Sequence, residues 1–470
     1  MFIRGGVAAV LFASFVLDAS SAGNAFNVRD HGARGERTTN DRVAIQAAIE
    51  ACAAAGGGKV VFPAGDYLCG GLRLASGVNI YLEAGATIWV STDPRDYSAG
   101  GSGSVYASGS WGHLFFADGA RNVSITGRGV INGQTTADHG GRWGVTTKLG
   151  FRTGILRFLD CRDVAVRGVS ILNSDAWTLH FRRCENVAVE DVTIRNNYRR
   201  QVTDGIDPDM CRNVRIARCR ISSGDDCIVL KTMEAHPCEN VTVSDCVLES
   251  AASALKLGTE SRGDFRNIRV TNCVITNTHT GIGLYLKDGG TMENITFSNI
   301  RIACCRPMAR AVTPVFADIE RRAADSKLGR IRNVTFENLD ITSGSGVLVQ
   351  GAPGRPVEDM VFRNIRFRVE QADDYAKRNK PVGGRRAAGD QCDASFARLP
   401  SYFTVAHARG FTLEDLWVSI GAAAFEQQPR SAFCGRHIDG LKVRNVRRDP
   451  AAESVGAVDL QDCRAAGETR

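Results

Sequence analysis

The sequence predicts an all-β protein, a single-stranded right-handed parallel β-helix with a short N-terminal capping α-helix. Three observations predict this fold. One short apolar phrase recurs through the middle of the chain. Within each copy the apolar residues alternate with polar ones, which is the period of a strand and not of a helix. Apolar residues at helical spacing occur just before the copies begin, and a run of glycines ends that segment.

The recurring phrase is the strongest signal in the sequence. The steps from the copy at Cys184 to the copy at Met292 are 27 residues each, four times running. A strand of this kind cannot pair its own edges, but coils stacked about 4.8 Å apart pair every strand with the coils above and below. The copies begin at Cys161, Cys184, Cys211, Cys238, Phe265, Met292, Ile331 and Val357.

Stacking predicts ladders of identical residues. We expect two ladders of core cysteines, and one ladder of turn asparagines that hold tight backbone geometry. The chain has 15 cysteines, an odd number, so at least one thiol is unpaired within the chain. The sequence leaves open whether most cysteines are buried small hydrophobes or whether some form bridges. The ladders are Cys184, Cys211 and Cys238; Cys219, Cys246 and Cys273; and Asn186, Asn213, Asn240, Asn267 and Asn294.

The chain divides into a leader, one β-helix domain and a tail. Residues 1–25 have the pattern of a secretory signal peptide, so we expect a secreted or periplasmic protein. The β-helix domain spans residues 26–450 and includes a surface loop at 371–398. Residues 451–470 form a C-terminal tail.

A helix at residues 39–55 should close the N-terminal end of the stack, because an open end exposes apolar core and an unpaired strand edge. Its apolar positions at helical spacing are Val43, Ile45, Ile49 and Cys52.

Composition excludes several classes of function. The net charge of +7 comes from scattered basic residues, and nothing in the chain resembles a nucleic-acid-binding module. No segment has 18 uninterrupted apolar residues, so we expect no membrane span. The cysteines lack the spacing of a zinc site, and we expect neither a metal nor a cofactor. We expect a monomer.

Two acidic motifs carry the candidate chemistry. Asp204 lies in the first motif, and Asp225 and Asp226 lie together in the second, at a point where a polar turn becomes an apolar strand. Stacking should gather these carboxylates on one face, and crowding should make the cluster retain a proton. A protonated acid beside an ionised base is what glycoside hydrolysis requires, with the two groups about 6.5–9.5 Å apart in inverting enzymes. We interpret Asp207 and Asp209 as turn caps.

These motifs resemble glycoside hydrolase family 28, the polygalacturonase and rhamnogalacturonase family. The resemblance rests on three segments, and it extends over nearly the whole chain after the leader. It implies an inverting hydrolase of a pectin-like or other plant-type polysaccharide, with no metal or organic cofactor. It implies that Asp225 is the general acid and that Asp204 and Asp226 activate the attacking water. The segments are DRVAIQAAIEACAAAGGGKVVFPAGDYLCGGLRLASGVNIYLEAGATI, GRGVINGQ, and VTDGIDPDMCRNVRI followed by SGDDC.

The chain departs from the family pattern at three places. Val202 replaces an asparagine, Ala252-Ser253-Ala254 replaces a Gly-His-Gly turn, and Gly283-Leu284-Tyr285 aligns with an Arg-Ile-Lys that binds a sugar carboxylate in pectin-cleaving members. The chain therefore lacks the histidine that the family pattern has next to the acid, and it lacks both cations of the Arg-Ile-Lys motif. The resemblance makes Glu260 a candidate substrate contact.

Strand alternation adds three outward-facing candidates for substrate binding. They are Lys256, Tyr285 and Lys287.

Two other functions stay open at this point. One is a non-catalytic carbohydrate-binding β-helix whose site has decayed, although three crowded carboxylates have no use in a binder. The other is a polysaccharide lyase on the same scaffold, which would need a strong base and an ion that neutralises the sugar carboxylate. The sequence does not fix the sugar, the linkage, or whether cleavage is internal or terminal. Those features depend on loops such as Ser98 to Gly112 and Asp138 to Gly150.

Overall fold

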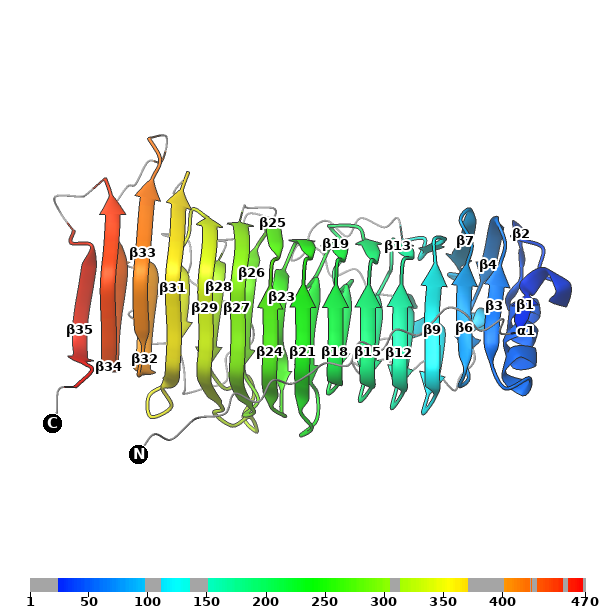
Figure 1. Cartoon of the computed structure of the whole chain (residues 1–470), viewed down its shortest axis with the longest axis horizontal. Coiled ribbons are helices and arrows are strands. Elements are labelled where there is room, and N and C mark those ends of the chain that lie inside the picture. The colour runs from blue at the N-terminus through cyan, green and yellow to red at the C-terminus, as the bar shows by residue number, and fades with distance from the viewer. Residues whose placement is uncertain are drawn as a thin grey trace, which may run out of the picture.

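The computed structural model of the chain is a long stack of parallel β coils with one helix at its N-terminal end (Figure 1). It describes residues 24–97, 111–135, 151–304, 313–370, 401–422, 424, 429–450 and 455–467. Most of the predicted signal peptide, the predicted loop at 371–398 and most of the two loops expected to set specificity lie outside the described residues. Each strand pairs in parallel with the matching strand of the next coil. The stacked coils form a right-handed parallel β-helix, as predicted.

Each coil contributes strands to three rows, and one row carries the candidate site. This site row consists of β5 (Leu72–Arg73), β8 (Trp111–Asp118), β11 (Arg152–Leu159), β14 (Leu179–Arg182), β17 (Ile206–Asp209), β20 (Ile228–Thr232), β23 (Ser253–Ser261), β26 (Thr280–Leu286), β28 (Thr313–Ile319), β30 (Val347–Gln350), β32 (Ser401–Arg409), β34 (Ser431–Asp449) and β35 (Val458–Ala465).

The other two rows close each coil and merge near the C-terminus. The second row consists of β1 (Ala25–Asn27), β3 (Gly58–Phe62), β6 (Val78–Leu82), β9 (Arg121–Gly127), β12 (Arg162–Arg167), β15 (Glu185–Glu190), β18 (Arg212–Ala217), β21 (Cys238–Ser244), β24 (Phe265–Thr271), β27 (Thr291–Cys304), β29 (Arg330–Thr342), β31 (Val357–Val369) and β33 (Thr412–Ile420). The third row consists of β2 (Glu36–Asn40), β4 (Gly65–Cys69), β7 (Ala86–Val90), β10 (Val130–Asn132), β13 (Ser170–Leu172), β16 (Thr193–Arg195), β19 (Arg220–Ser223), β22 (Val247–Ser250) and β25 (Val274–Thr278). The long strand β27 pairs with both β24 and β25, so from there one strand serves both rows.

The predicted ladders are confirmed. The asparagine side chains hydrogen-bond from coil to coil, as where Asn213 donates to Asn186 over 3.0 Å and Asn240 donates to Asn213 over 3.1 Å. Their φ angles near +56° lie in the left-handed region, which asparagine tolerates better than most residues. The cysteines of both ladders are buried, and all the cysteines that the structure describes are free thiols. They therefore act as small core side chains.

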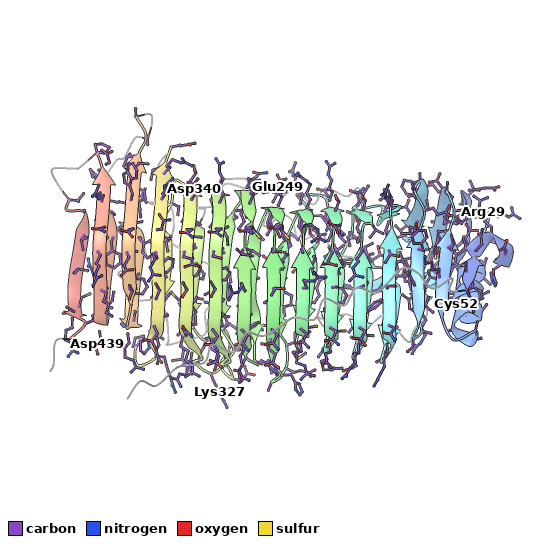
Figure 2. The ribbon with its side chains drawn as sticks, in the orientation of Figure 1. Arg29, Cys52, Glu249, Lys327, Asp340 and Asp439 are labelled. Atoms are coloured by element: carbon purple, nitrogen blue, oxygen red, sulfur yellow. The ribbon has the colours of Figure 1, made fainter. Side chains whose placement is uncertain are left out.

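The capping helix is shorter than predicted. Helix α1 spans Arg42–Ala54, because residues 39 and 40 belong to β2. Ile45, Ile49 and Cys52 face the core, and Figure 2 labels Cys52 at this end of the stack. The prediction that Val43 is part of the apolar face is wrong, since this side chain is 75% exposed. None of the described helices is long and apolar enough to cross a membrane.

The prediction of a loose tail at 451–470 is wrong for Val458–Ala465, which forms β35. This strand pairs with β34 in parallel register, Phe433 opposite Val458 and Ile438 opposite Cys463. It pairs with the edge of β34 and is the terminal strand of the stack among the described residues. Among the described residues, short 3₁₀ helices span Val28–His31 and Pro94–Asp96.

Candidate active site

The three predicted carboxylates lie in equivalent turns of neighbouring coils. Asp204 precedes β17 and Asp226 precedes β20, and Ile206 pairs with Ile228, so Asp204 and Asp226 occupy the same register position. The Gly205 amide donates to the Asp226 carbonyl over 2.9 Å, which fixes one turn upon the other. One oxygen from each carboxylate of Asp204, Asp225 and Asp226 lies within 4.8 Å of the others. The structure thus brings the trio together.

The three carboxylates differ in exposure and in their hydrogen bonds. Asp204 and Asp226 are buried, whereas Asp225 is half-buried and reaches the surface. Asp225 accepts a hydrogen bond of 2.9 Å from the Val202 amide. Val202 has a φ of 60°, a left-handed conformation that a β-branched residue rarely adopts, so the chain is held there under strain. The replaced asparagine of the family pattern would fit this backbone more easily.

The crowding has an electrostatic consequence. Burial and the neighbouring Asp225 carboxylate raise the pKa of Asp204 to about 8, although the Lys231 ammonium acts in the opposite direction. The cluster therefore retains a proton at neutral pH, as the sequence suggested. A proton shared among close carboxylates belongs to the cluster as a whole.

The separation of the carboxylates is shorter than expected. Nearest oxygens within 4.8 Å fall below the range of about 6.5–9.5 Å between acid and base in inverting enzymes, and near the 5–5.5 Å of retaining ones. The expected wide spacing is therefore not found, and geometry alone does not select inversion. Three oxygens at this spacing could also ligate a cation, and this trio is the one such group among the residues that the structure describes.

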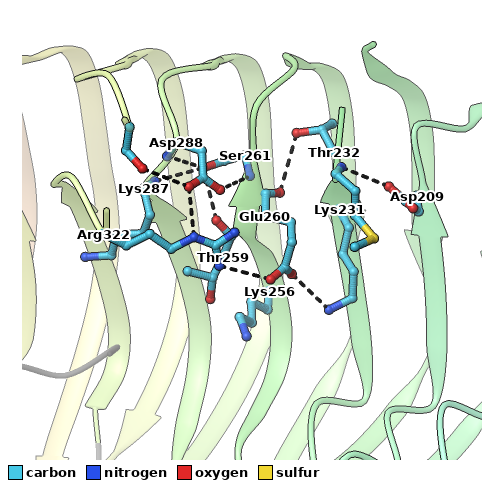
Figure 3. Close-up of polar contacts among 12 residues, drawn as sticks. Asp209, Lys231, Thr232, Lys256, Thr259, Glu260, Ser261, Lys287, Asp288 and Arg322 are labelled. Atoms are coloured by element: carbon cyan, nitrogen blue, oxygen red, sulfur yellow. Dashed lines mark hydrogen bonds and ion pairs between the residues drawn. The ribbon is translucent and has the colours of Figure 1, made fainter. Parts of the chain in front are cut away.

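A lysine that sequence reasoning missed, Lys231, lies beside the trio, and Figure 3 shows it reaching Glu260. Lys231 is 3% exposed, and its Nζ lies 3.6 Å from Asp204, 3.6 Å from Asp207 and 3.4 Å from Glu260. Its ammonium also lies 4.5 Å from the centre of the Trp177 ring. On β20, Leu230 faces the core and Lys231 follows it on the outer face. The alternation argument that identified Lys256 on β23, applied to the preceding coil, would have identified Lys231 as well.

The interpretation of Asp207 and Asp209 as turn caps is wrong. Both belong to strand β17 and are fully buried. Burial, and then the Asp204 carboxylate, raise the pKa of Asp207 well above its usual range. Asp209 accepts a hydrogen bond of 3.1 Å from the Met233 amide and lies 3.5 Å from His180. Asp207 and Asp209 thus extend the buried polar network from Lys231 to His180 in the preceding coil.

Glu260 joins this network instead of standing open to a ligand. It is 8% exposed and accepts a 3.0 Å hydrogen bond from Arg322. Burial acts to raise its pKa, but Lys231, Lys256 and Arg322 outweigh burial and lower the pKa to about 2. Arg322 follows β28 in a connection without repeat register, so no sequence pattern could place it here. Figure 3 shows Arg322 between Glu260 and Asp288.

Lys256 reaches the carboxylates, as alternation predicted. Its Nζ donates to the Asp226 carboxylate over 2.7 Å and lies 5.4 Å from the centre of the Tyr285 ring. Burial lowers the pKa of this ammonium, but the charge of Asp226, the charge of Glu260 and the hydrogen bond to Asp226 together outweigh burial, and the net pKa is raised. Asp226 also accepts from the Ser253 amide over 3.0 Å. Lys256 and the Ser253 turn therefore orient Asp226 where the family pattern has Gly-His-Gly.

The other two candidate substrate contacts, Tyr285 and Lys287, are buried. Tyr285 is 5% exposed and packs on Phe316, with ring centres 4.8 Å apart. Lys287 is 1% exposed and pairs with Asp318 and Glu320, so its charge is neutralised within the fold. The expectation that Lys287 supplies a charge to the cleft does not agree with this arrangement.

Buried cations also border the carboxylates on the N-terminal side. Arg152 is 2% exposed, donates to the Gln201 carbonyl over 2.6 Å and lies 3.9 Å from Asp175. Arg200 pairs with the same carboxylate. Trp111 and Trp177 pack edge to face beside them, with ring centres 5.9 Å apart.

A right-handed parallel β-helix with three close carboxylates at neighbouring turns of one row is an arrangement that can support acid–base chemistry. The sequence profile of Glycosyl hydrolases family 28 matches residues 52–381, more than half of the chain and all of the trio. The chain belongs to this family of glycoside hydrolases.

Individual relatives agree with this assignment. A probable polygalacturonase of Vitis vinifera is 31% identical over 217 residues, which cover 43% of each chain. A probable rhamnogalacturonase A of Aspergillus oryzae is 28% identical over 211 residues, 44% of this chain and 39% of that protein. The chain spans about half the length of the curated relatives it matches.

Among solved structures, an exopolygalacturonase of Thermotoga maritima is similar, with 27% identity and a TM-score of 0.64 over 74% of this chain and 87% of that one. A family 28 exopolygalacturonase of Yersinia enterocolitica has 18% identity and a TM-score of 0.67, over 91% and 78% of the two chains, and supports the fold.

Proposed function

We propose that the protein is an exported, inverting glycoside hydrolase that acts on a pectin-like or other plant-type polysaccharide. The observation that carries the proposal is the carboxylate trio, in which Asp225 reaches the surface while Asp204 and Asp226 are buried. Family membership and the relatives named above support a glycosidic bond as the target.

The proposed reaction assigns one role to each carboxyl group. Asp225 delivers to the glycosidic oxygen the proton that the cluster shares and that Asp204 holds in the free protein. That oxygen leaves with the electrons of its bond to the anomeric carbon, and Asp204 is left ionised. Asp204 and Asp226 orient a water molecule, and one of them takes its proton as the water oxygen attacks the same carbon. The proton that the cluster gains from water restores the one that Asp225 gave away.

The lysines support these roles electrostatically. Lys256 pairs with Asp226 and Lys231 lies beside Asp204, so positive charge stabilises the two carboxylates proposed to act on water. Asp225 accepts a hydrogen bond from the Val202 amide and lies on the solvent-facing side of the cluster, where a leaving oxygen can approach. Inversion is drawn from the resemblance to the family, because the short carboxylate spacing does not distinguish it.

The test is Asp225→Asn, assayed on a panel of plant polysaccharides with product analysis. We expect kcat to fall by about 10²–10⁴-fold, since Asn cannot donate the proton. Asp245→Asn is the matched control, because Asp245 is an exposed turn residue with left-handed geometry that asparagine also adopts. Full activity of Asp225→Asn would contradict the assignment.

Two readouts on the wild-type enzyme separate the alternatives. NMR of the first-formed product should show inversion at the anomeric carbon, and retention would assign one of the close carboxylates as a nucleophile. Products that absorb in the ultraviolet through a new double bond would indicate a lyase. Binding without any product would indicate a carbohydrate-binding protein.

A further inference from the structure

Two buried arginines on the N-terminal side of the trio indicate which group of a substrate binds next to Asp225. We infer that Arg152 and Arg200 form a subsite for the carboxylate of a uronic acid unit. This subsite lies on the other side of the trio from residues 283–285, where the family pattern has its Arg-Ile-Lys. The inference rests on the proposed function, because it concerns the substrate of the same site.

Arg152 and Arg200 keep guanidinium nitrogens that have no hydrogen-bond partner. The two side chains are 2% and 5% exposed. Arg152 donates from Nη2 to the Gln201 carbonyl over 2.6 Å, and Arg200 pairs through Nη2 with Asp175. The Nε and Nη1 atoms of both arginines are buried and have no hydrogen-bond partner among the described residues. Unused donors on a buried cation are costly, so this pattern indicates that a bound acceptor completes the site.

Asp175 cannot supply the missing acceptors. One of its oxygens accepts a hydrogen bond of 2.6 Å from the Thr135 hydroxyl and also pairs with Arg200. The other oxygen lies 3.9 Å from Nε of Arg152, which is within the distance of an ion pair but too far for a hydrogen bond. Two buried cations therefore share one carboxylate, and a second carboxylate would meet both positive charge and unused N–H groups.

Both guanidinium groups are charged at neutral pH. Burial lowers the pKa of Arg200 to about 10. Burial also lowers the pKa of Arg152, while the charges of Asp175, Asp225 and Asp204 act in the opposite direction. The pair therefore presents cations, and not neutral donors, to a ligand.

The turn at residues 201 and 202 connects this pair to the proposed acid. The Gln201 carbonyl accepts from Arg152, and the next amide, that of Val202, donates to Asp225 over 2.9 Å. Asp175 and Asp225, which are the carboxylates next to the pair, are both half-buried, so the pair lies close to the surface. A sugar unit next to Asp225 can therefore place a substituent against Arg152.

The chemistry of the donors favours a carboxylate. A guanidinium group is a planar fork whose parallel N–H groups match the two oxygens of a carboxylate. A sugar hydroxyl offers one oxygen and no charge, so it would leave part of each fork unused. Uronic acid units are the sugars that carry such a carboxylate.

The lysines considered for this role on the C-terminal side are already paired. Lys256 donates to Asp226 over 2.7 Å, and Lys287 is held by Asp318 and Glu320. A sugar carboxylate would have to take either ammonium from a buried acid, and a buried carboxylate that loses its partner is costly. The unused donors of Arg152 and Arg200 impose no such loss.

The experiment compares matched pairs of substrates. Pectic oligosaccharides of several linkages are prepared as the native uronates and as their carboxyl-reduced forms, in which each carboxylate is a primary alcohol. The ratio of kcat/KM for the two members is measured for the wild type, Arg152→Met and Arg200→Met. Arg195→Met is the matched control, because Arg195 is an exposed arginine on β16, in the same coil as Arg200 but in the third row.

We expect the wild type to prefer the native member by about tenfold or more. Arg152→Met and Arg200→Met should each lower this preference by about tenfold, through a raised KM for the native member, and Arg195→Met should keep it. The ratio compares two substrates on one preparation, so a partly unfolded variant still reports the preference of its folded fraction. Arg200→Lys keeps a charge for Asp175 without the fork, serves if a Met variant does not fold, and should lose part of the preference.

The outcomes distinguish this inference from the proposed function. Equal cleavage of both members, or preference for the reduced member, would overturn the inference and leave the hydrolase intact. Full wild-type preference in all the variants of Arg152 and Arg200 would overturn it as well, because the carboxylate would then be bound elsewhere. If the wild type cleaves no member of any pair, the proposed function fails and the inference fails with it.

Discussion

At the scale of single residues, Asp204 gives the protein a stability that falls with rising pH. Its pKa is raised from 3.8 to about 8 on folding, so the folded state holds a proton that the unfolded state releases. The resulting penalty is absent below pH 3.8, grows between pH 3.8 and 8, and is constant above. The burial of Asp204 among other carboxylates therefore costs stability at neutral pH.

We predict that Asp204→Asn removes most of this penalty. The variant should gain on the order of 2 kcal/mol of unfolding free energy at about pH 7 and lose stability less steeply than wild type from about pH 4 to 8. Denaturation midpoints measured across this range check the prediction, and activity should be lost in the same variant. A variant no more stable than wild type at the alkaline end of the range would contradict it.

Glu260 has the opposite dependence on pH. Its pKa is lowered from 4.5 to about 2 by the surrounding cations, so it contributes stability above pH 4.5 that is lost as the pH falls toward 2. We predict that Glu260→Gln lowers the midpoint at neutral pH and flattens the acid limb of the stability curve. The exposed Glu370→Gln serves as control and should leave both unchanged. An unaltered acid limb in Glu260→Gln would count against the ion-pair network.

Sequence reasoning placed the acids of the site better than its bases. Asp204, Asp225 and Asp226 lie at repeat-related turns, so the stacking of the repeats is enough to place them in one neighbourhood. Lys231 follows the same strand alternation and could have been found. Arg322 could not, because it comes from a connection that obeys no repeat.

At the scale of the coil, the asparagine ladder combines hydrogen bonds with a left-handed backbone. Asn240 donates to Asn213 and accepts from Asn267, each over 3.1 Å. We predict that Asn240→Ala lowers the unfolding free energy by about 2 kcal/mol, through strain and lost hydrogen bonds. Asn240→Gly keeps the backbone relaxed and should cost less, so the difference between the two measures the strain. Equal costs in a urea titration would show that the left-handed backbone contributes nothing.

At the scale of the whole molecule, β35 replaces the long edge of β34 with a shorter terminal strand that carries Asp459, Asp462 and Arg464. We predict that a chain ending at residue 450 lacks β35, exposes the edge of β34 and aggregates. Light scattering during a thermal ramp should show an earlier onset than for the full chain. A chain ending at residue 467 retains β35 and should behave as wild type, and identical onsets for both truncations would contradict this role.

The sequence predicted the architecture but not its C-terminal closure. Copies of one phrase identify the coils, because each coil must present the same apolar positions to its neighbours. The segment at Val458–Ala465 contains no copy of the phrase, and its Leu460 is 47% exposed. It therefore lacks the pattern of buried apolar residues from which a strand could have been predicted. The prediction for Val43 was wrong because an apolar residue at helical spacing need not face the core.

The 27-residue step that repeats from Cys184 to Met292 has a consequence for how such a molecule can vary. Because each turn touches only the turn before and the turn after, duplication of one complete period far from Asp225 would leave the reacting groups undisturbed. The stack could thus be lengthened by gene duplication while the carboxylate trio keeps its geometry, so the length of the surface beside the trio would vary independently of the trio itself.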